Sequence, residues 1–318
     1  MVIIQLAGGL GNQMFQYALY LQFQNLHKEV KIDDVAGFVE DEKRDPSLSA
    51  FGITYQKADP KEIEEMLDAS LLFWHRVRRK LFGRKRKSYF EADKRFKPEI
   101  FTWDDIYLEG YWQTEKYFEA VADQVRAAFD VDRLLMVQQA EDMVKAGRTK
   151  QQTKVQTYLR QITQTQSVSL HIRRGDYLTP ENQALFGGIC TEAYYKEAVR
   201  LMRKQYPGCR FFLFTNDKEW AKERFADDKG GRTTETALAD GEPADVIVVD
   251  LPEGSDHEEF ALMSKCKHHI LANSSFSWWA SYLNQNPGKT VLAPTKWLNG
   301  WDCQDFYRED MRKVSVTP

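Results

Sequence analysis

The residues best suited to chemistry lie in one run, His171-Ile172-Arg173-Arg174-Gly175-Asp176-Tyr177. The run follows the apolar residues Val168–Leu170, so we expect a buried strand that ends in a loop. Both arginines stay charged at physiological pH, and the planar guanidinium group matches the oxygens of a phosphate. Ligands of open α/β sheets bind outside the carboxyl ends of the strands. The run therefore favours a nucleotide diphosphate site, with arginines that brace the loop through Asp176 as the alternative.

Three further apolar runs end in polar residues in the same way. They are Phe211–Phe214 before Thr215-Asn216-Asp217, Val246–Val249 before Asp250, and His269–Ala272 before Asn273-Ser274-Ser275. Helical patterns over 191–206, 218–225 and 276–284 lie between or after them. Strands that alternate with helices predict a parallel, doubly wound sheet, whose carboxyl strand ends meet at one edge. We expect one ligand crevice at that edge.

A second candidate is the glycine turn Gly8-Gly9-Leu10-Gly11-Asn12-Gln13, between an expected strand over 2–7 and a helix over 13–26. With a strand over 30–33, these elements form a βαβ opening. The turn resembles a dinucleotide fingerprint and Asp33-Asp34 suit a ribose, so an NAD-dependent oxidoreductase is an alternative function. Met14, where the third glycine should stand, counts against it. The glycines predict close approach of the backbone to a ligand, with helix N–H groups facing it.

Composition narrows the class of protein. With 318 residues, 42% hydrophobic content and a net charge of −3, the chain fits a two-domain globular enzyme and not a nucleic-acid binder. The cysteines are scattered without metal-ligand spacing, which counts against structural zinc and favours a reducing compartment; they are Cys190, Cys209, Cys266 and Cys303. No window approaches the ~18–20 apolar residues of a membrane span, and no signal-peptide pattern opens the chain. We expect a soluble, cytoplasmic protein.

One stretch departs from this balance. Eleven lysines and arginines lie between Arg76 and Lys97, interleaved with Leu81, Phe82, Tyr89, Phe90 and Phe96, and preceded by Trp74. A solvated helix face and loop would explain them. Peripheral contact with the anionic lipid of the inner membrane face, or with a lipid-linked acceptor, is the functional alternative. Nucleic acid is less favoured, because no recognition fold accompanies the patch.

Several longer motifs in a fixed order carry a resemblance that covers nearly the whole chain. They are 8–18 (GGLGNQMFQYA), 108–118 (LEGYWQTEKYF), 171–177 (HIRRGDY), 190–195 (CTEAYY), 262–266 (LMSKC) and 273–279 (NSSFSWW). Together they resemble the bacterial α-1,2-fucosyltransferases of glycosyltransferase family 11.

The resemblance implies an α/β protein of GT-B type, with two Rossmann-like, doubly wound domains facing across a cleft. We expect residues 1–155 to form the acceptor-side domain and 156–300 the GDP-fucose domain, with 301–318 returning to the first. The implied activity is inverting transfer of L-fucose from GDP-fucose to the 2-hydroxyl of a terminal β-galactoside, in surface glycan synthesis. The acceptor is a glycan or lipid-linked oligosaccharide, and no metal or other cofactor is expected. A non-catalytic carbohydrate-binding protein with the same cleft is the remaining alternative.

Residue roles follow from the same resemblance. Arg173 contacts the diphosphate, and Arg174 lies beside it or braces the loop. A guanine needs a carboxylate, which Glu259 supplies by its spacing from Ser274, with Asp256 or Glu258 as substitutes. The donor-binding residues that we expect are Gly9, Gly11, Asn12, His171, Arg173, Arg174, Asn216, Asp250, Glu259, Asn273, Ser274 and Ser275. Asp250 is a further candidate for contact with the ribose, and His171 is a cleft contact or a packed strand-end histidine.

The general base is left open between several carboxylates. Asp176 belongs to the motif, Glu181 follows it at a spacing with precedent in related fucosyltransferases, and Glu109 comes from the other domain; a dissociative mechanism needs none of them. We count Arg173, Asp176 and Glu181 as catalytic. The string Asp130-Val131-Asp132 matches a metal-binding motif of sugar transferases, but it follows a helix, so a turn and helix cap is preferred. Trp278 and Trp279 are interpreted as core and not as a sugar platform.

Overall fold

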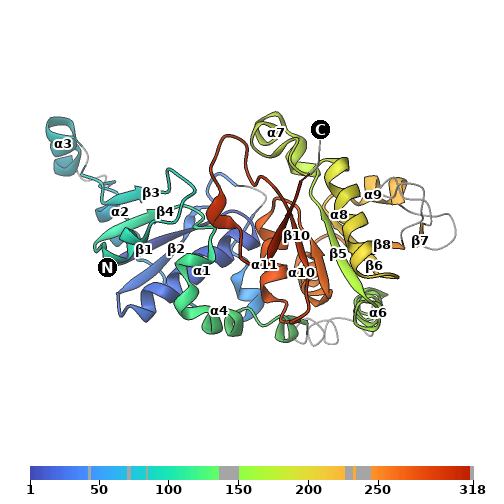
Figure 1. Cartoon of the computed structure of the whole chain (residues 1–318). Coiled ribbons are helices and arrows are strands. Elements are labelled where there is room, and N and C mark those ends of the chain that lie inside the picture. Colours follow the sequence, from blue (N-terminus) through green and yellow to red (C-terminus); the bar gives the residue numbers. More distant parts are fainter. Residues whose placement is uncertain are drawn as a thin grey trace. The chain divides into compact units, whose positions relative to one another are not determined.

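The computed structural model describes residues 1–41, 44–69, 73–83, 85–135, 150–225, 232–233 and 245–315 (Figure 1). The chain forms two compact units. Unit 1 comprises Met1–Phe129 with Gln304–Phe306, and unit 2 comprises Asp130–Cys303 with Tyr307–Pro318. The division lies earlier than the expected 155/156, because helix α6 (Lys150–Gln164) packs on strand β5 (Ser167–Ile172) and helix α10 (Asp256–Lys265) of unit 2.

The end of the chain also differs from expectation. Of residues 301–318, only Gln304–Phe306, the short turn η6, belong to unit 1. Strand β11 (Met311–Val314) instead pairs with β10 (Val291–Pro294) in unit 2. Its buried ends, Met311 and Val314, extend the apolar core of that unit.

Unit 1 is built on a four-stranded parallel sheet in the order β2-β1-β4-β3. Its strands are β1 (Val2–Ala7), β2 (Val30–Gly37), β3 (Ser88–Phe90) and β4 (Ile106–Glu109). Helix α1 (Leu10–Asn25) covers β1 and β2 and is buried along most of its length. The helix begins three residues before the predicted Gln13, because Gly9 is its N-cap.

Two helical sequence patterns of unit 1 give shorter helices in the structure. The acidic amphipathic pattern of residues 60–73 gives α2 (Pro60–Met66), which ends early since Asp68 takes a left-handed backbone conformation with φ of 50°. The helical pattern of residues 114–129 gives two 3₁₀ turns, η3 (Glu115–Tyr117) and η4 (Glu119–Val121), followed by α4 (Ala122–Ala128). Phe118 is non-helical with φ of −138° and is fully buried, so tertiary packing overrides the helical pattern. The remaining elements are η1 (Leu48–Phe51), α3 (Phe73–Phe82) and η2 (Pro98–Thr102).

Unit 2 contains a seven-stranded sheet in the order β11-β10-β9-β5-β6-β8-β7. Besides β5, β10 and β11, its strands are β6 (Arg210–Thr215), β7 (Arg232–Thr233), β8 (Val246–Val248) and β9 (His268–Ile270). All pairs are parallel except β7 with β8. Every residue of β5 is buried, as expected for a central strand covered on both faces.

The crossover helices of unit 2 complete the α/β pattern. They are α6, α7 (Pro180–Phe186), α8 (Glu192–Gln205), α9 (Lys218–Phe225), α10 and α11 (Ser275–Leu283), and the turn η5 (Gly175–Leu178) follows β5. Two parallel sheets with helical crossovers confirm the predicted α/β fold of two Rossmann-like units. Trp278 and Trp279 are fully buried, which confirms their assignment to the core. Among the helices in the described part of the chain, none is both long and apolar enough to cross a bilayer.

Candidate active site

The carboxyl edge of the unit 2 sheet gathers most of the predicted site residues. Strand register pairs Ile172 with Thr215, Leu170 with Ile270, and Leu213 with Val248. The polar residues that follow these strands therefore lie at one edge, as the sequence predicted; they are 171–177, Asn216-Asp217, Asp250 and Asn273–Ser275.

Arg173 is held in place at this edge by Asp176. Its Nε and Nη2 atoms donate to the two Asp176 oxygens at 2.8 Å and 2.7 Å. Asn216 Nδ2 donates to the same carboxylate at 3.0 Å. A Cβ on Gly175 would lie 2.6 Å from Asn216 Nδ2, so only glycine permits this close approach. Because a guanidinium carries five N–H donors, Arg173 keeps donors for an anion while Asp176 fixes its orientation.

Arg174 points to different partners. Its backbone N–H donates to Asn216 Oδ1 at 3.0 Å, and its Nε donates to Asp217 Oδ2 at 3.2 Å. The guanidinium carbon lies 4.5 Å from the centre of the Trp220 ring on α9. This geometry braces the loop against α9, the second of the two roles considered for Arg174.

His171 is buried behind the arginines, with 3% of its surface exposed. Its ring lies 5.9 Å from that of Phe276, and its carbonyl accepts from the Tyr195 hydroxyl at 3.0 Å. Burial lowers the pKa of His171 to about 3, and the charge of Arg173 contributes in the same direction. The imidazole is therefore neutral, and its Nδ1 has no hydrogen-bond partner in the described part of the chain.

The N-terminus of α11 lies at the same edge as Arg173. Ser274 is the N-cap and its Oγ accepts from the Phe276 N–H at 3.4 Å. Asn273 is buried and donates to the Trp297 carbonyl at 3.1 Å, while its own carbonyl accepts from the Tyr177 hydroxyl at 2.9 Å. The Tyr177 contact ties the arginine loop to the start of α11. Backbone N–H groups at a helix N-terminus attract anions, so the edge offers two independent sources of positive potential.

The two carboxylates assigned to the nucleoside already have cationic partners on α9. Glu259 is 8% exposed and its Oε1 lies 2.7 Å from Lys218 Nζ. Burial raises the pKa of Glu259 to about 7, more than Lys218 lowers it. Asp250 pairs with Lys222 at 3.3 Å and with Lys154 at 3.4 Å.

Lys218 and Lys222 were missed by the sequence analysis. Their spacing of four residues just after the polar end of β6 is the signal that could have found them, since it places both on one face of α9.

The glycine turn of unit 1 is internally bonded. Gly8 has a φ of +75°, and a Cβ there would lie 2.7 Å from Asn12 Nδ2. Asn12 Oδ1 accepts from Gln113 Nε2 at 2.6 Å, and Gln13 Nε2 donates to the Gly8 carbonyl at 2.8 Å. Gly9 is the N-cap of α1, and Gly11 is buried within its first turn. The turn thus requires glycine at position 8, and it leads directly into the N-terminus of the long helix α1.

Asp33 does not suit the ribose role weighed for it. Only 2% of the residue is exposed, and its carboxylate accepts from the Tyr107 hydroxyl at 2.7 Å. It also accepts from the backbone N–H groups of Val35 and Ala36 at 3.0 Å and 3.1 Å. These contacts shape the end of β2 and leave the carboxylate inside the fold, which removes Asp33 from the features that suggested NAD.

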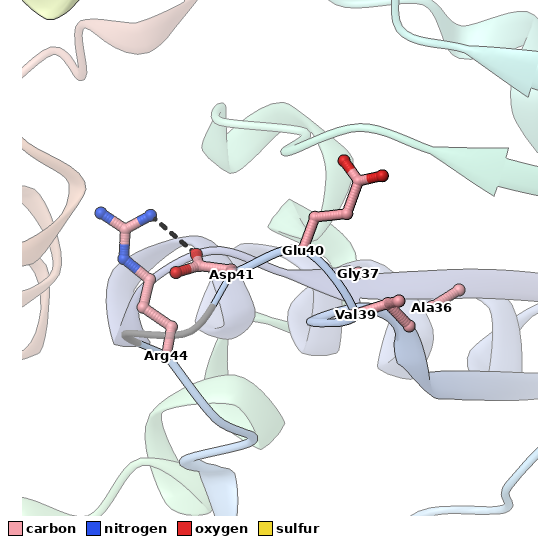
Figure 2. A pocket seen from close by; sticks show the side chains of 6 residues that line it. All are labelled: Ala36, Gly37, Val39, Glu40, Asp41 and Arg44. Atoms are coloured by element: carbon pink, nitrogen blue, oxygen red, sulfur yellow. Dashed lines mark hydrogen bonds and ion pairs between the residues drawn. The ribbon is translucent and has the colours of Figure 1, made fainter.

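A pocket of about 710 Å³ lies beside the glycine turn in unit 1 (Figure 2). Its lining residues come after the carboxyl end of β2 or from the end itself: Ala36, Gly37, Val39, Glu40, Asp41 and Arg44. Asp41 and Arg44 form an ion pair at 3.1 Å, while the Glu40 side chain extends separately. A Cβ on Gly9 would lie 3.8 Å from Arg44 Nε, so pocket and turn are neighbours. No motif or pattern in the sequence indicates this pocket.

The three candidate bases differ in how they are engaged. Asp176 is bonded to Arg173 and Asn216, and Glu109 pairs with Arg86 at 3.1 Å. Glu181 lies in the first turn of α7, exposed, with no ion pair to another described residue.

The Asp130-Val131-Asp132 string is a cap. Asp130 Oδ1 accepts from the N–H groups of Asp132 and Arg133 at 2.9 Å and 3.3 Å, and Asp132 pairs with Lys265 at 2.5 Å. This confirms the turn-and-cap interpretation.

The comparison with protein families decides the class. The profile described as Glycosyl transferase family 11 matches residues 87–311. The chain belongs to this family. The resemblance drawn from the six motifs is thereby confirmed.

Relatives from bacteria and primates agree with this assignment. The chain is 27% identical over 96% of its length to an Escherichia coli alpha-1,2-colitosyltransferase, covering 95% of that protein. It is also 27% identical to the O-antigen biosynthesis glycosyltransferase WbnK of Escherichia coli, over 93% of this chain and 94% of the other. The galactoside alpha-(1,2)-fucosyltransferase 1 of Ateles belzebuth is 25% identical, over 87% of this chain and 63% of its own.

Similar solved structures are more distant. The Escherichia coli ADP-heptose LPS heptosyltransferase II is 14% identical with a TM-score of 0.44, over 99% of this chain and 90% of the other. A mutant of Arabidopsis thaliana FUT1 in complex with GDP is 10% identical with a TM-score of 0.43, over 92% of this chain and 69% of the other. At these TM-scores the fold assignment rests on the two parallel sheets themselves.

Proposed function

We propose that this glycosyltransferase moves L-fucose from GDP-fucose to the 2-hydroxyl of a terminal β-galactoside, with inversion, during surface glycan synthesis in the cytoplasm. The names of its relatives support a fucose-like sugar and a galactoside acceptor. The observation that carries the proposal is Arg173, oriented by Asp176 beside the N-terminus of α11.

The chemistry suits these groups. Fucosyl transfer has an oxocarbenium-like transition state, and the departing GDP gathers negative charge. Fixed donors aimed at developing charge typically contribute more to catalysis than any other effect. Arg173 and the first N–H groups of α11 supply them, with hydroxyl donors from Ser274 and Ser275. Arg174 acts by bracing the loop that carries Arg173.

The nucleoside is assigned to the α9–α10 side of the edge. Glu259 in its ionised form accepts from N1–H and the exocyclic amine of guanine, and Lys218 favours that form against the effect of burial. Asp250 bonds the ribose, with Lys222 beside it. His171 is neutral, and its Nδ1, which has no partner among the described residues, is assigned to accept a hydrogen bond from a hydroxyl group of GDP-fucose. Glu181 takes the proton of the acceptor hydroxyl, because Asp176 is engaged with Arg173.

Unit 1 is assigned to the acceptor. Its pocket beside the glycine turn is lined by the carboxylates of Glu40 and Asp41, which bind sugar hydroxyls. Ala36 and Val39 add apolar side chains to the lining. Gly9, Gly11 and Asn12, at the N-terminus of α1 next to this pocket, stay assigned to the donor. Replacing Glu40 by Gln should raise KM for the acceptor and leave that for GDP-fucose unchanged.

Thermal unfolding with GDP, UDP, CMP and NAD in turn, all in EDTA, tests the donor assignment. A ligand at ~100 times its dissociation constant stabilises by about 2.7 kcal/mol. GDP alone should raise Tm; a shift with NAD, or with no nucleotide, contradicts the proposal.

Transfer is then measured with GDP-fucose and methyl β-galactoside. Its 2-deoxy analogue is the matched control. Product from the analogue would refute the linkage, and nucleotide binding without turnover would indicate a carbohydrate-binding protein. GDP-linked colitose, which lacks the 3-hydroxyl of fucose, tests which of the two sugars is preferred.

A further inference from the structure

Helix α3 and the residues after it carry a dense positive charge. Residues 73–87 read FWHRVRRKLFGRKRK, with eight lysines or arginines and no aspartate or glutamate. Within α3, Val77 and Leu81 are four residues apart and share one face. Arg76 and Lys80 share a second face, rotated by about 100° from the first. The helix is therefore amphipathic, with cations beside an apolar stripe.

Some cations of this stretch serve the fold. Arg78 pairs with the buried Asp68, whose second oxygen accepts from the Lys85 N–H at 2.9 Å. Arg86 pairs with Glu109 at 3.1 Å, and Lys87 with Asp105 at 3.5 Å. These contacts attach α3 and the following residues to the body of unit 1.

Other cationic side chains of this stretch make no ion pair with the described residues of the fold. Arg76, Lys80 and Lys85 are exposed, and none is paired with an acid of the described residues. Leu81 is 69% exposed on the neighbouring face. Its apolar surface lies in water beside these cations, and transfer into an apolar phase would lower its free energy.

We propose that α3 docks unit 1 on the surface of an anionic phospholipid bilayer. The cations bind lipid phosphates, while Val77 and Leu81 enter the boundary between headgroups and acyl chains. Duplex nucleic acid would bind the cations but gives Leu81 no apolar contact. The proposal rests on these residues and not on the transferase reaction, so each can fail without the other.

Co-sedimentation of the full chain with vesicles tests it. Vesicles of phosphatidylglycerol and phosphatidylcholine in equal parts should bind the protein, salt should weaken binding, and phosphatidylcholine alone should not bind. The double variant Arg76→Gln with Lys80→Gln should lower the partition coefficient of the protein onto these vesicles about 30-fold. Each lost cation accounts for about fivefold, and the two effects multiply. Leu81→Gln should lower it roughly tenfold. The matched control is Arg160→Gln with Lys204→Gln, two exposed cations of unit 2, which should bind as the wild type does.

Four results would overturn the proposal. The first is no binding of the wild type to anionic vesicles, and the second is equal binding to anionic and neutral vesicles. The third is a loss of binding in the control variant as large as in the Arg76 and Lys80 variant. The fourth is a Leu81→Gln protein that binds normally while the Arg76 and Lys80 variant does not. The last pattern, together with displacement by a DNA duplex, would assign the helix to nucleic acid. Unchanged circular dichroism and Tm verify folding, and unchanged transfer to a soluble acceptor separates docking from catalysis.

Discussion

Replacing Arg173 by alanine should abolish most activity while barely affecting stability. The Arg173–Asp176 pair is bidentate, but the two side chains are 28% and 30% exposed. A partly exposed pair contributes about 1 kcal/mol or less to folding. Asp176 would keep its bond from Asn216 and would gain access to water. We therefore expect Tm to fall by no more than about 4 °C.

The expected effect on catalysis is much larger. A fixed donor at developing negative charge is typically worth about 2.7–4 kcal/mol, or a 10²- to 10³-fold change in rate. Arg173→Lys should fall between wild type and alanine, because lysine keeps the charge but cannot make the bidentate pair. The assay is the initial rate of GDP release from GDP-fucose with a β-galactoside, on protein whose folded fraction is measured by thermal unfolding.

Arg210 provides a matched control at the opposite edge of the same sheet. It begins β6 and pairs with Asp245 at 2.6 Å, with similar exposure of the side chains. Arg210→Ala should lower Tm as much as Arg173→Ala and leave the rate unchanged. An Arg173→Ala protein that keeps more than about a tenth of its activity would refute the role in catalysis. A large fall in Tm with activity in proportion to folded protein would instead establish the bracing role.

Other predictions concern single groups of the same edge. The pKa of Glu259 is 4.5 ordinarily and about 7 in the fold, so folding retains its proton and the free energy of unfolding falls as pH rises between these values. Glu259→Gln should remove about 3 kcal/mol of that fall, measured by urea unfolding at pH 4.5 and 7.5. The pKa of His171 lies near 3, so its NMR signals should not titrate between pH 5 and 8, and its contribution to stability is lost as pH falls below 6.5. Ser274→Ala should cost about 1 kcal/mol of stability as a lost N-cap, whereas Ser275→Ala should not; denaturant titration compares them. Glu181→Gln should lower kcat at least tenfold, with KM for GDP-fucose unchanged, in initial-rate measurements; an unaltered kcat excludes it as the base.

The sequence predicts best where local pattern and tertiary role agree. The strand β1 and the helix α9 were predicted with the bounds that they have in the structure, and the four strand ends do meet at one edge. Buried parallel strands are continuous apolar runs, and the polar residues that end them are needed at the edge. For these elements, one pattern encodes both the fold and the site.

Prediction fails where a residue's partner comes from a distant part of the chain. The local pattern suggests Asp33 as a ribose ligand, but Tyr107, which follows it by 74 positions, takes its carboxylate into the core. Lys218 can be recognised as a site residue only from its ion pair with Glu259, which lies on another helix. The strands β10 and β11 and the helices α7 and α10 were not predicted. These features depend on pairings that no local pattern records.

The charge balance at the edge of unit 2 bears on the proposed role of its cations. Arg173, Lys218 and Lys222 each face an acid already, namely Asp176, Glu259 and Asp250. An unpaired arginine or lysine would fold back on the surface or attract any anion, whereas a paired one is held in a single orientation. Its remaining donors then point to a fixed place, so little reorganisation is needed when charge develops there. The acids therefore weaken binding of a resting anion and favour one whose charge increases during the reaction, as that of a departing nucleoside diphosphate does.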